Sequence, residues 1–294
     1  MHNQSKFRYK AAMFLSFAGP SVLLFSAVVI VPFIFGIYLT FTGWDGISSN
    51  IPFIGLKNYS MLFKDVEFWI SLGRTILYAL ISVLLANMVA FGLAYLVTSK
   101  IKGSNFFRAT FFTPNLIGGI VLGYIWQFVF NKAILMIGDV TGIKLFNTSW
   151  LSDPNKAFWA LIIVSVWQLS GYLMLIYIAG LMGVSEDLKE AAKIDGCTEK
   201  QTMRHITIPM IMGTFTICFF LAITRCFVTY DVNISLTNGG PYNSTRLAAM
   251  YVYNMAFSSK KYGLGQAEAL VLFMVIAIIA ISQVLLGKKK EVEA

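Results

Sequence analysis

The chain has 294 residues, of which 57% are hydrophobic and only 13% are charged, and its mean hydropathy is +0.71. Apolar runs of about 20 residues, the length that spans a bilayer core as a helix, recur along it. The composition therefore excludes soluble domains and predicts a polytopic membrane protein. A net charge of +9 alone would fit nucleic-acid binding. Basic residues beside apolar spans are usually topology signals instead, so we expect no nucleic-acid partner.

The apolar runs predict an all-α integral membrane fold with six transmembrane helices in one domain, residues 1–294. The basic N-terminus and the first apolar run resemble a signal peptide. That run is too long and has no small-residue cleavage site, so we expect a retained first helix. The predicted helices cover about 12–40, 72–98, 107–130, 158–183, 209–231 and 266–287.

The distribution of basic residues predicts the orientation. An even number of spans places both termini on one side of the membrane. More than half of the 23 Lys and Arg residues fall in the segments on that side, and the rest are spread over longer segments on the other. The positive-inside rule then predicts cytoplasmic N- and C-termini, and a cytoplasmic polar loop at 185–209.

Motifs for covalent chemistry are missing from the sequence. It contains no G-x-x-x-x-G-K-[ST] phosphate loop, no H-E-x-x-H and no paired-cysteine zinc spacing, and its only histidines are His2 and His205. Cys197, Cys218 and Cys226 give no disulfide framework and are interpreted as packing residues. An integral-membrane enzyme is therefore disfavoured, transport is favoured, and we expect no metal site or cofactor held by this chain.

The polar loop between the fourth and fifth predicted helices has the signals of two short helices. Ser185 can cap a first helix that has acids in its first turn, and Gly196 supplies a left-handed stop. Thr198 begins a capping box for a second helix, and Pro209 marks the return to the membrane. From these signals alone, a solvated connector is as good an interpretation as a binding element.

The spacing in this loop resembles the signature of the membrane subunits of binding-protein-dependent ABC importers. Glu190-Ala191-Ala192, Gly196 and Ile206-x-Ile208-Pro209 match it, with Ile208 where leucine is usual and Cys197 where alanine is common. The segments L-T-N-G-G-P at 236–241 and Y-N-M-A-F at 253–257, with F-R-A-T-F-F-T-P, resemble the maltose-type first permease subunit. The resemblance covers most of the chain, which lacks the larger outer domain and so resembles the six-helix members.

The resemblance implies a type I ABC importer permease fold in the cytoplasmic membrane of a prokaryote, surrounded by membrane lipid. A second homologous permease subunit would complete the sugar pathway as a heterodimer. Two cytoplasmic ATPase subunits would bind ATP and Mg, and an external solute-binding protein would deliver the sugar. The residues implied in ATPase coupling are Glu190, Ala191, Ala192, Asp195, Gly196, Ile206 and Pro209.

The fifth predicted helix has a polar face that includes Arg225. An arginine in a span costs about 2.5–3.5 kcal/mol on insertion scales, so we expect it to face a cavity or a partner. Counted from the loop, the resemblance places this face on the stretch that lines the sugar site, together with part of the fourth helix. The predicted substrate-binding residues are Gln168, Tyr172, Ala222, Arg225, Cys226 and Thr229.

Structural alternatives exist for these residues. Tyr172 could be a packing residue, Thr229 could bond back to its own helix, and Arg225 could form an ion pair with Glu268 or Asp231. The alternative substrate class is an acidic or phosphorylated sugar or polyol, with Arg225 as the partner of the anion. A secondary transporter is a remote alternative that would leave the polar loop unexplained.

The outer segment after the fifth helix contains a turn-rich motif. We predict that it forms an outer gate or a docking element for the binding protein, and a simple tight turn is an equally good interpretation. Its residues are Thr237, Asn238, Gly239, Gly240 and Pro241.

Overall fold

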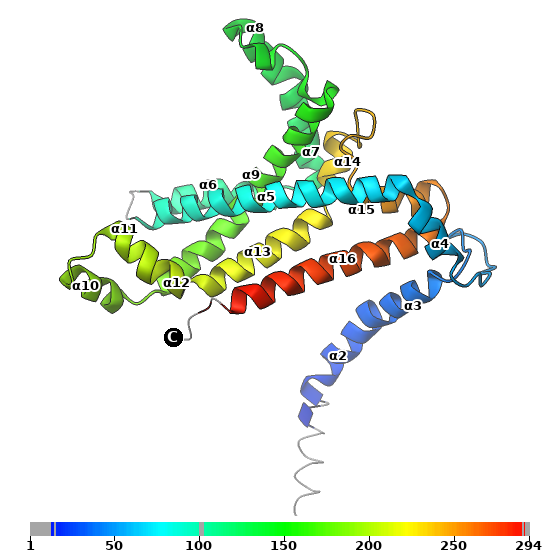
Figure 1. Cartoon of the computed structure of the whole chain (residues 1–294), viewed down its shortest axis with the longest axis horizontal. Helices are drawn as coiled ribbons and strands as arrows, with labels where there is room; N and C mark the ends of the chain where they lie inside the picture. The colour runs from blue at the N-terminus through cyan, green and yellow to red at the C-terminus, as the bar shows by residue number, and fades with distance from the viewer. Residues whose placement is uncertain (1–12, 15, 100–102, 290, 292–294) are drawn as a thin grey trace, which may run out of the picture. The chain divides into compact units, whose positions relative to one another are not determined.

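The computed structural model describes residues 13–14, 16–99, 103–289 and 291 (Figure 1). Its regular elements in these ranges are helices, with one isolated β-bridge between Thr42 and Phe53. The described residues form two compact units. One contains the chain up to Asp65 with 252–270, and the other contains 66–251 with the chain from Val271 onward.

The described ranges contain five helices that are long and apolar enough to cross a membrane. A sixth candidate is a bent pair, in which Glu199–Met210 and Met212–Phe227 meet at 67°. This agrees with the predicted all-α membrane fold, while the predicted basic flanks at 6–10, 100–102 and 290 lie outside the described residues. The five helices are Gly19–Leu39, Val66–Thr98, Gly119–Thr141, Pro154–Gly183 and Tyr262–Lys288.

Prolines divide the first span of the N-terminal unit. Pro20 and Pro32 stand in the first turns of α2 and α3, where a missing N–H costs least. A π-helical turn, η1, ends two residues before the second proline. The helices in or entering this unit are α2 (Gly19–Phe25), η1 (Ser26–Ile30), α3 (Val31–Leu39), α4 (Lys57–Lys64), η6 (Asn254–Ser258) and the start of α16 (Tyr262–Lys288).

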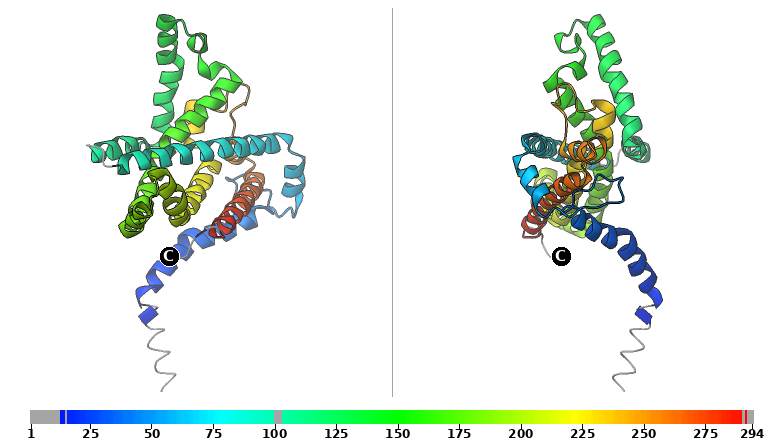
Figure 2. Two further views of the ribbon diagram at one scale, coloured as in Figure 1. Left: turned by 60° about the vertical axis from the view of Figure 1, so that its left-hand side comes forward. Right: turned by 90° about the vertical axis from the view of Figure 1, so that its right-hand side faces the viewer.

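The second unit is built around α5, α9 and α13. Helix α5 packs along α9, α13 packs on both, α6 lies on α9, and α14 lies on α7, as Figures 1 and 2 show. Its helices are α5 (Val66–Thr98), α6 (Ser104–Leu116), α7 (Gly119–Phe128), η2 (Val129–Ala133), α8 (Ile134–Thr141), η3 (Lys144–Phe146), η4 (Trp150–Ser152), α9 (Pro154–Gly183), α10 (Glu186–Ile194), α11 (Glu199–Thr202), η5 (Met203–Thr207), α12 (Ile208–Met210), α13 (Met212–Phe227), α14 (Asp231–Leu236), most of α15 (Ala248–Tyr253) and α16 from Val271 onward.

Glycines allow the closest helix contacts in this unit. A Cβ added at Gly171 of α9 would collide with the carbonyl oxygen of Phe111 in α6, and one at Gly123 of α7 would collide with the Ser235 hydroxyl in α14. Small residues let helix backbones approach closely in lipid, where packing and hydrogen bonds drive association. Gly171 and Gly123 therefore fix where α6 and α14 lie.

Two predicted spans differ from the structure. The predicted helix 107–130 is two helices, because α6 ends at Leu116 and α7 begins at Gly119 and continues through η2 and α8 to Thr141. The break does not fall at Pro114, which lies within α6. The chain becomes extended at Ile117 and Gly118. The predicted helix 209–231 is continuous only over Met212–Phe227, since the bend falls at Ile211 and a second break precedes α14.

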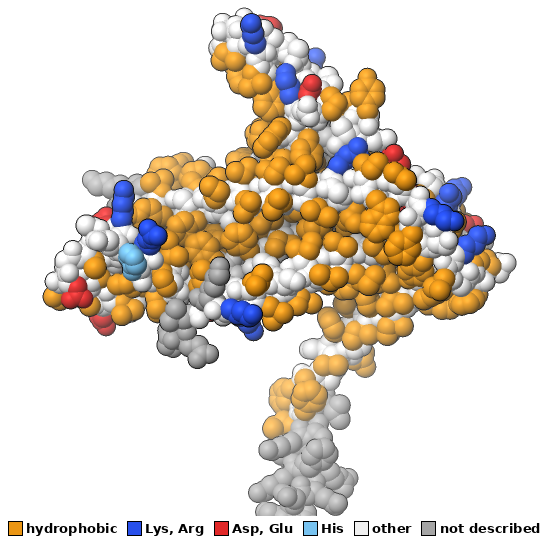
Figure 3. Space-filling view, viewed as in Figure 1, with side chains coloured by type: hydrophobic (Ala, Val, Ile, Leu, Met, Phe, Trp, Pro, Cys, Tyr) orange, Lys and Arg blue, Asp and Glu red, His pale blue; other side chains and the backbone are white. Residues whose placement is uncertain are grey.

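The surface of the long helices is apolar where lipid would cover it. Exposed large side chains include Leu80, Met88 and Leu96 along α5 and Ile281 and Leu285 along α16. In Figure 3 hydrophobic side chains cover the lengths of these helices, and charged ones gather toward helix ends and loops. A chain with this distribution is stable only when the apolar surface faces a bilayer or partner helices.

Candidate functional site

A pocket of about 280 Å³ opens in the second unit, between α5, α7, α9 and the end of α13. Polar side chains concentrate here, although the surrounding helices are strongly apolar. Polar groups inside a membrane protein are expensive and usually mark a pathway or binding site. The polar side chains that line the pocket are Tyr78, Ser165, Gln168, Arg225, Thr229, Tyr230 and Asp231.

Arg225 is exposed at this pocket and is held from two sides. Its Nη1 donates a hydrogen bond of 2.8 Å to Oδ1 of Asn115, and its Cζ lies 4.4 Å from the centroid of the Tyr172 ring. The alternative ion pair with Asp231 is not among those of the described residues, and Arg225 has an amide partner and an aromatic face instead. Glu268 belongs to the other unit, so the alternative ion pair with it stays a prediction.

Two other polar side chains of the pocket are bonded within the unit. Gln168 Nε2 donates a hydrogen bond of 3.2 Å to the carbonyl of Ile117, and Thr229 Oγ1 donates one of 3.1 Å to the carbonyl of Arg225. The latter is the back-bond that the alternative interpretation of Thr229 predicted. The break after α6 thus exposes a carbonyl that Gln168 satisfies, which links the irregular backbone to the pocket wall.

The structure brings together four of the six predicted substrate residues and separates two. Gln168, Arg225, Cys226 and Thr229 line the pocket. Ala222 is fully buried. Tyr172 is half-buried and acts on the pocket only through its contact with Arg225. Cys226 is almost fully buried as well, in agreement with its interpretation as a packing residue.

Sequence reasoning missed Tyr78, Ser165 and Asn115. Tyr78 is fully buried in α5 and donates to the hydroxyl of Ser165, with a longer bond of 3.4 Å to Oγ1 of Thr229. A tyrosine among apolar residues gives a weak signal, because it resembles core. A buried tyrosine hydroxyl, however, usually needs a partner, and that partner lies on another helix.

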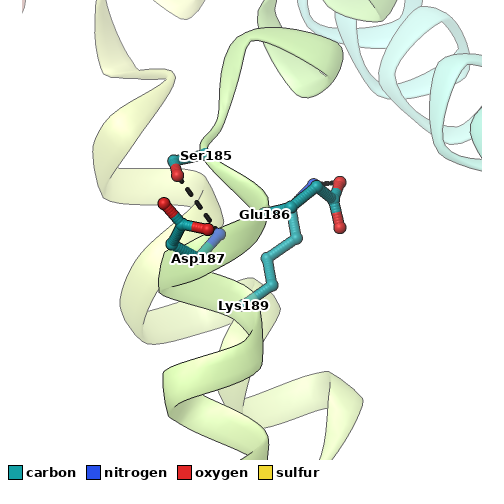
Figure 4. Close-up of polar contacts among 4 residues, drawn as sticks. All are labelled: Ser185, Glu186, Asp187 and Lys189. Atoms are coloured by element: carbon teal, nitrogen blue, oxygen red, sulfur yellow. Dashed lines mark hydrogen bonds and ion pairs between the residues drawn. The ribbon is translucent and has the colours of Figure 1, made fainter.

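The polar loop begins with the predicted cap. Oγ of Ser185 accepts from the backbone N–H of Asp187 at 3.2 Å, and Lys189 pairs with Glu186 at 2.9 Å across the first turn of α10 (Figure 4). Acids in the first turn also match the positive end of the helix dipole. The N-terminus of α10 is therefore well defined although the helix has only nine residues.

The C-terminus of α10 has a left-handed stop. Gly196 has φ +77°, and the N–H groups of Gly196 and Cys197 donate to the carbonyls of Lys193 and Ala192 at 3.1 and 2.9 Å. These two bonds form a Schellman motif. Thr198 and Gln201 then form the predicted capping box of α11, and the backbone continues through η5 and α12 to the bend at Ile211.

The exposed surface of α10 is small and partly apolar. Glu190 and Ala191 are exposed, Ala192 is buried against the unit, and Ile194 is 86% exposed. Ile194 lies three and four residues from Ala191 and Glu190, so the three residues share a face of the helix. The sequence signal for Ile194 was available, because an isoleucine near the end of a charged helix has no core to enter. Among the other predicted coupling residues, Ile206 lies in η5 and Pro209 in α12, both half-exposed.

Comparison with known proteins decides the family. The family described as "Binding-protein-dependent transport system inner membrane component" matches residues 86–291. The chain belongs to this family. It is 42% identical over 293 residues, covering 100% of both chains, to the "Probable starch degradation products transport system permease protein AmyD" of Thermoanaerobacterium thermosulfurigenes. It is 35% identical over 261 residues, covering 89% of this chain and 90% of the other, to the "Multiple sugar-binding transport system permease protein MsmF" of Streptococcus mutans.

A solved structure confirms the permease fold. The structure described as a bacterial ABC transporter involved in the import of the acidic polysaccharide alginate has a TM-score of 0.82 over 98% of this chain and 99% of that one, at 18% identity. The permease is therefore a multi-pass inner-membrane protein with the type I ABC importer fold, of the carbohydrate-importer type. It is a transport component and not itself catalytic, and it works with an ATPase and a solute-binding protein.

The turn-rich motif of the permease is an internally hydrogen-bonded loop. Asn238 and Gly239 have φ of 47° and 78°, and Thr245 Oγ1 lies 2.8 Å from the carbonyl of Gly240 and 2.7 Å from Oγ1 of Thr237. The peptide bond between Gly240 and Pro241 is cis. Asn233, which sequence reasoning missed, is fully buried beneath it. Its Nδ2 donates 2.8 Å to the carbonyl of Thr245.

Proposed function

We propose that this permease forms half of the membrane pathway of a sugar or oligosaccharide importer, with a second homologous permease as the other half. The names of its relatives support a carbohydrate substrate, because they refer to starch degradation products, multiple sugars and, at 33% identity, diacetylchitobiose. The apolar surface left exposed on the long helices supports a helical partner and surrounding lipid. ATP and Mg would be bound by separate ATPase subunits.

One observation carries the assignment of the substrate site: the side chains around Arg225 combine hydrogen-bonding groups with an aromatic ring. Gln168 and Arg225 offer amide and guanidinium groups to the pocket, and the Tyr172 ring packs against the guanidinium. Sugars are bound by a few placed polar groups together with aromatic faces. We therefore assign the pocket to the sugar as it passes the membrane.

The pocket favours a neutral sugar over an acidic one. Arg225 and Asp231 both line it, so their formal charges cancel. An acidic substrate would gain from the guanidinium but would also meet the carboxylate. The exposure of Arg225 still supports an acidic or phosphorylated sugar as the second candidate, with the guanidinium as anion partner.

The loop with α10 is proposed as the site where the ATPase docks. Its exposed face is formed by Glu190, Ala191 and Ile194, which gives a close-approach surface with an apolar contact beside a carboxylate. The helix path from α11 to α13 is continuous except for the bend at Ile211, so motion of the loop would be transmitted to the helix that bears Arg225. This predicts a cytoplasmic loop, and hence cytoplasmic termini.

The experiment is ATPase stimulation in the reconstituted transporter with its binding protein, with maltooligosaccharides and uronic-acid oligosaccharides compared. A neutral-sugar importer is stimulated by the former, and Arg225→Gln raises the half-saturating sugar concentration without abolishing basal ATPase activity. Stimulation by acidic sugars alone, lost in Arg225→Gln, would establish the second candidate. Stimulation by neither class would overturn the carbohydrate assignment.

A further inference from the structure

A second cavity, of about 370 Å³, lies entirely within the N-terminal unit. It is formed by the segment after α3, by α4, and by the turn that leads into α16. Lys57, Lys260 and Lys261 line it, and no acidic residue is among its lining residues. We call this the lysine pocket. It is separate from the sugar pocket, which lies in the other unit.

The walls of the lysine pocket are held by buried hydrogen bonds. Asn58 is buried, and its Nδ2 donates 2.8 Å to the carbonyls of both Thr40 and Thr42. The N–H of Gly263 donates 3.0 Å to the carbonyl of Trp44, and a Cβ at Gly263 would collide with the carbonyl of Thr42. The cavity is therefore a built feature, in which the chain after α3 is joined to the start of α16.

An anion can reach the lysines of the pocket, and Lys261 also interacts electrostatically with the buried Glu268 of the same unit. All three are exposed, and the ion pairs found among the described residues involve other cations, Lys189 and Arg246. Lys260 has φ +54° in the turn before α16, an uncommon backbone conformation that places two successive lysines at the rim. Three lysines that line one cavity, with no acid in its lining, favour a ligand that carries a phosphate.

The position of the pocket indicates where that phosphate comes from. Candidate membrane spans end at Leu39 and begin at Tyr262, so the pocket lies at the level where spans meet the headgroups. Trp44 and Tyr262 pack edge to face, 5.1 Å apart, and such aromatic residues are enriched at this level. Ile54, Met61 and Leu264 supply an apolar wall to the same cavity. The three lysines, the aromatic pair and the apolar wall together match a phospholipid headgroup with the start of its acyl chains.

We propose that the lysine pocket binds the phosphate headgroup of an anionic phospholipid, in the leaflet that the ends of these two spans reach. Lys57, Lys260 and Lys261 contact the phosphate, and the apolar wall receives the glycerol and upper acyl region. Figures 1 and 3 show α4 together with the turn before α16 and basic side chains at that end of the unit. The proposal does not depend on which sugar is carried.

The test measures lipid retained by the detergent-purified transporter. The complex is exchanged into mixed micelles with equal phosphatidylglycerol and phosphatidylcholine, and bound lipid is measured by native mass spectrometry. A juxtamembrane lysine contributes roughly 1 kcal/mol toward an anionic surface, which is about a fivefold change in affinity. The triple variant K57Q/K260Q/K261Q should therefore lose most of the preference for phosphatidylglycerol. The matched control, K132Q/K144Q/K156Q, removes the same charge elsewhere and should keep it.

Two further measurements distinguish a lipid phosphate from free phosphate, and a lipid partner from an acidic protein surface. Inorganic phosphate at millimolar concentration should not displace phosphatidylglycerol, because it lacks the apolar part. Equal phosphatidylglycerol preference in the triple variant and the wild type would overturn the proposal. So would a triple variant that retains the lipid but loses stimulation by the binding protein, since the lysines would then contact an acidic protein surface. Size-exclusion profiles of both variants establish that the complex is intact.

Discussion

The guanidinium of Arg225 lies over the ring of Tyr172, with 4.4 Å between Cζ and the ring centroid. The two residues come from different helices, α13 and α9. The contact therefore orients the guanidinium and also packs the two helices against each other at this point. A cation–π contact of this kind contributes about 0.5–2 kcal/mol. Asn115 holds the guanidinium from the other side.

Tyr172→Leu should weaken sugar binding because Arg225 loses the surface that directs it. A loss of about 0.5–2 kcal/mol corresponds to roughly a two- to thirtyfold rise in the half-saturating sugar concentration. Tyr172→Phe keeps the ring and should stay near wild type. The measurement is sugar-dependent ATPase activity in reconstituted membranes. Equal half-saturation in Tyr172→Leu and the wild type would show that Tyr172 only packs.

Sequence reasoning found Arg225 for a physical reason that operates at every position of a span. A charged side chain is so costly in lipid that it must face a cavity or a partner, so its presence in an apolar run predicts one of the two. Asn115 and Tyr78 carry no such signal. Their roles depend on α6 and α5 lying beside α9 and α13, which no local pattern encodes. Polar residues of moderate cost become recognisable only when their partners on other helices are known.

The same limit explains the errors in the spans. Hydropathy predicts how much of the chain can cross the membrane. It does not detect a helix break whose unpaired backbone groups are hydrogen-bonded by a neighbouring helix. The chain leaves helical geometry at Ile117, and the exposed carbonyl there is bonded by Gln168 of α9. Capping in the polar loop was predictable residue by residue, since Ser185, Gly196 and Thr198 act within a few positions of themselves.

Gly171→Ala should destabilise the permease because its Cβ would enter the backbone of α6 at Phe111. Overpacking of this kind typically costs about 1–3 kcal/mol. Gly73→Ala is the control, since a Cβ there meets nothing within 4 Å, and an alanine in a helix is favoured over glycine by roughly 0.5–1 kcal/mol. Thermal unfolding of the purified complex should therefore shift down for Gly171→Ala only. A matching decrease for both variants would mean that helix approach is not the cause.

Substitutions of Gly196 should impair coupling in the order set by backbone strain. A Cβ at Gly196 has open space around it, so the only penalty is its left-handed φ of +77°. That conformation costs a non-glycine residue about 1–2 kcal/mol, and asparagine less. We expect sugar-stimulated ATPase activity to fall from wild type through Gly196→Asn and Gly196→Ala to Gly196→Val. Expression should be unchanged, and equal activity across the series would show that the end of α10 does not affect coupling.

Ile194→Ser tests the exposed apolar contact of α10 separately from its fold. The side chain is 86% exposed, so its replacement should leave the thermal stability of the chain unchanged. Loss of a buried contact of this size at an interface costs about 1–3 kcal/mol, so less ATPase subunit should co-purify. Lys200→Gln, an exposed change on α11, is the control and should retain the ATPase. Full co-purification with Ile194→Ser would exclude this residue from the docking surface.

Asn233→Ala should loosen the loop that contains residues 237–241 without changing its surface. The Asn233 side chain donates to the carbonyl of Thr245 and accepts from the N–H of Leu247 at 3.2 Å, all of it buried. Each buried group left without a partner costs about 1–3 kcal/mol. Hydrogen exchange of the Leu247 amide should accelerate in Asn233→Ala. It should stay slow in Asn238→Gly, because glycine adopts the positive φ of that exposed position readily. An unchanged Leu247 amide in Asn233→Ala would show that other contacts hold the loop.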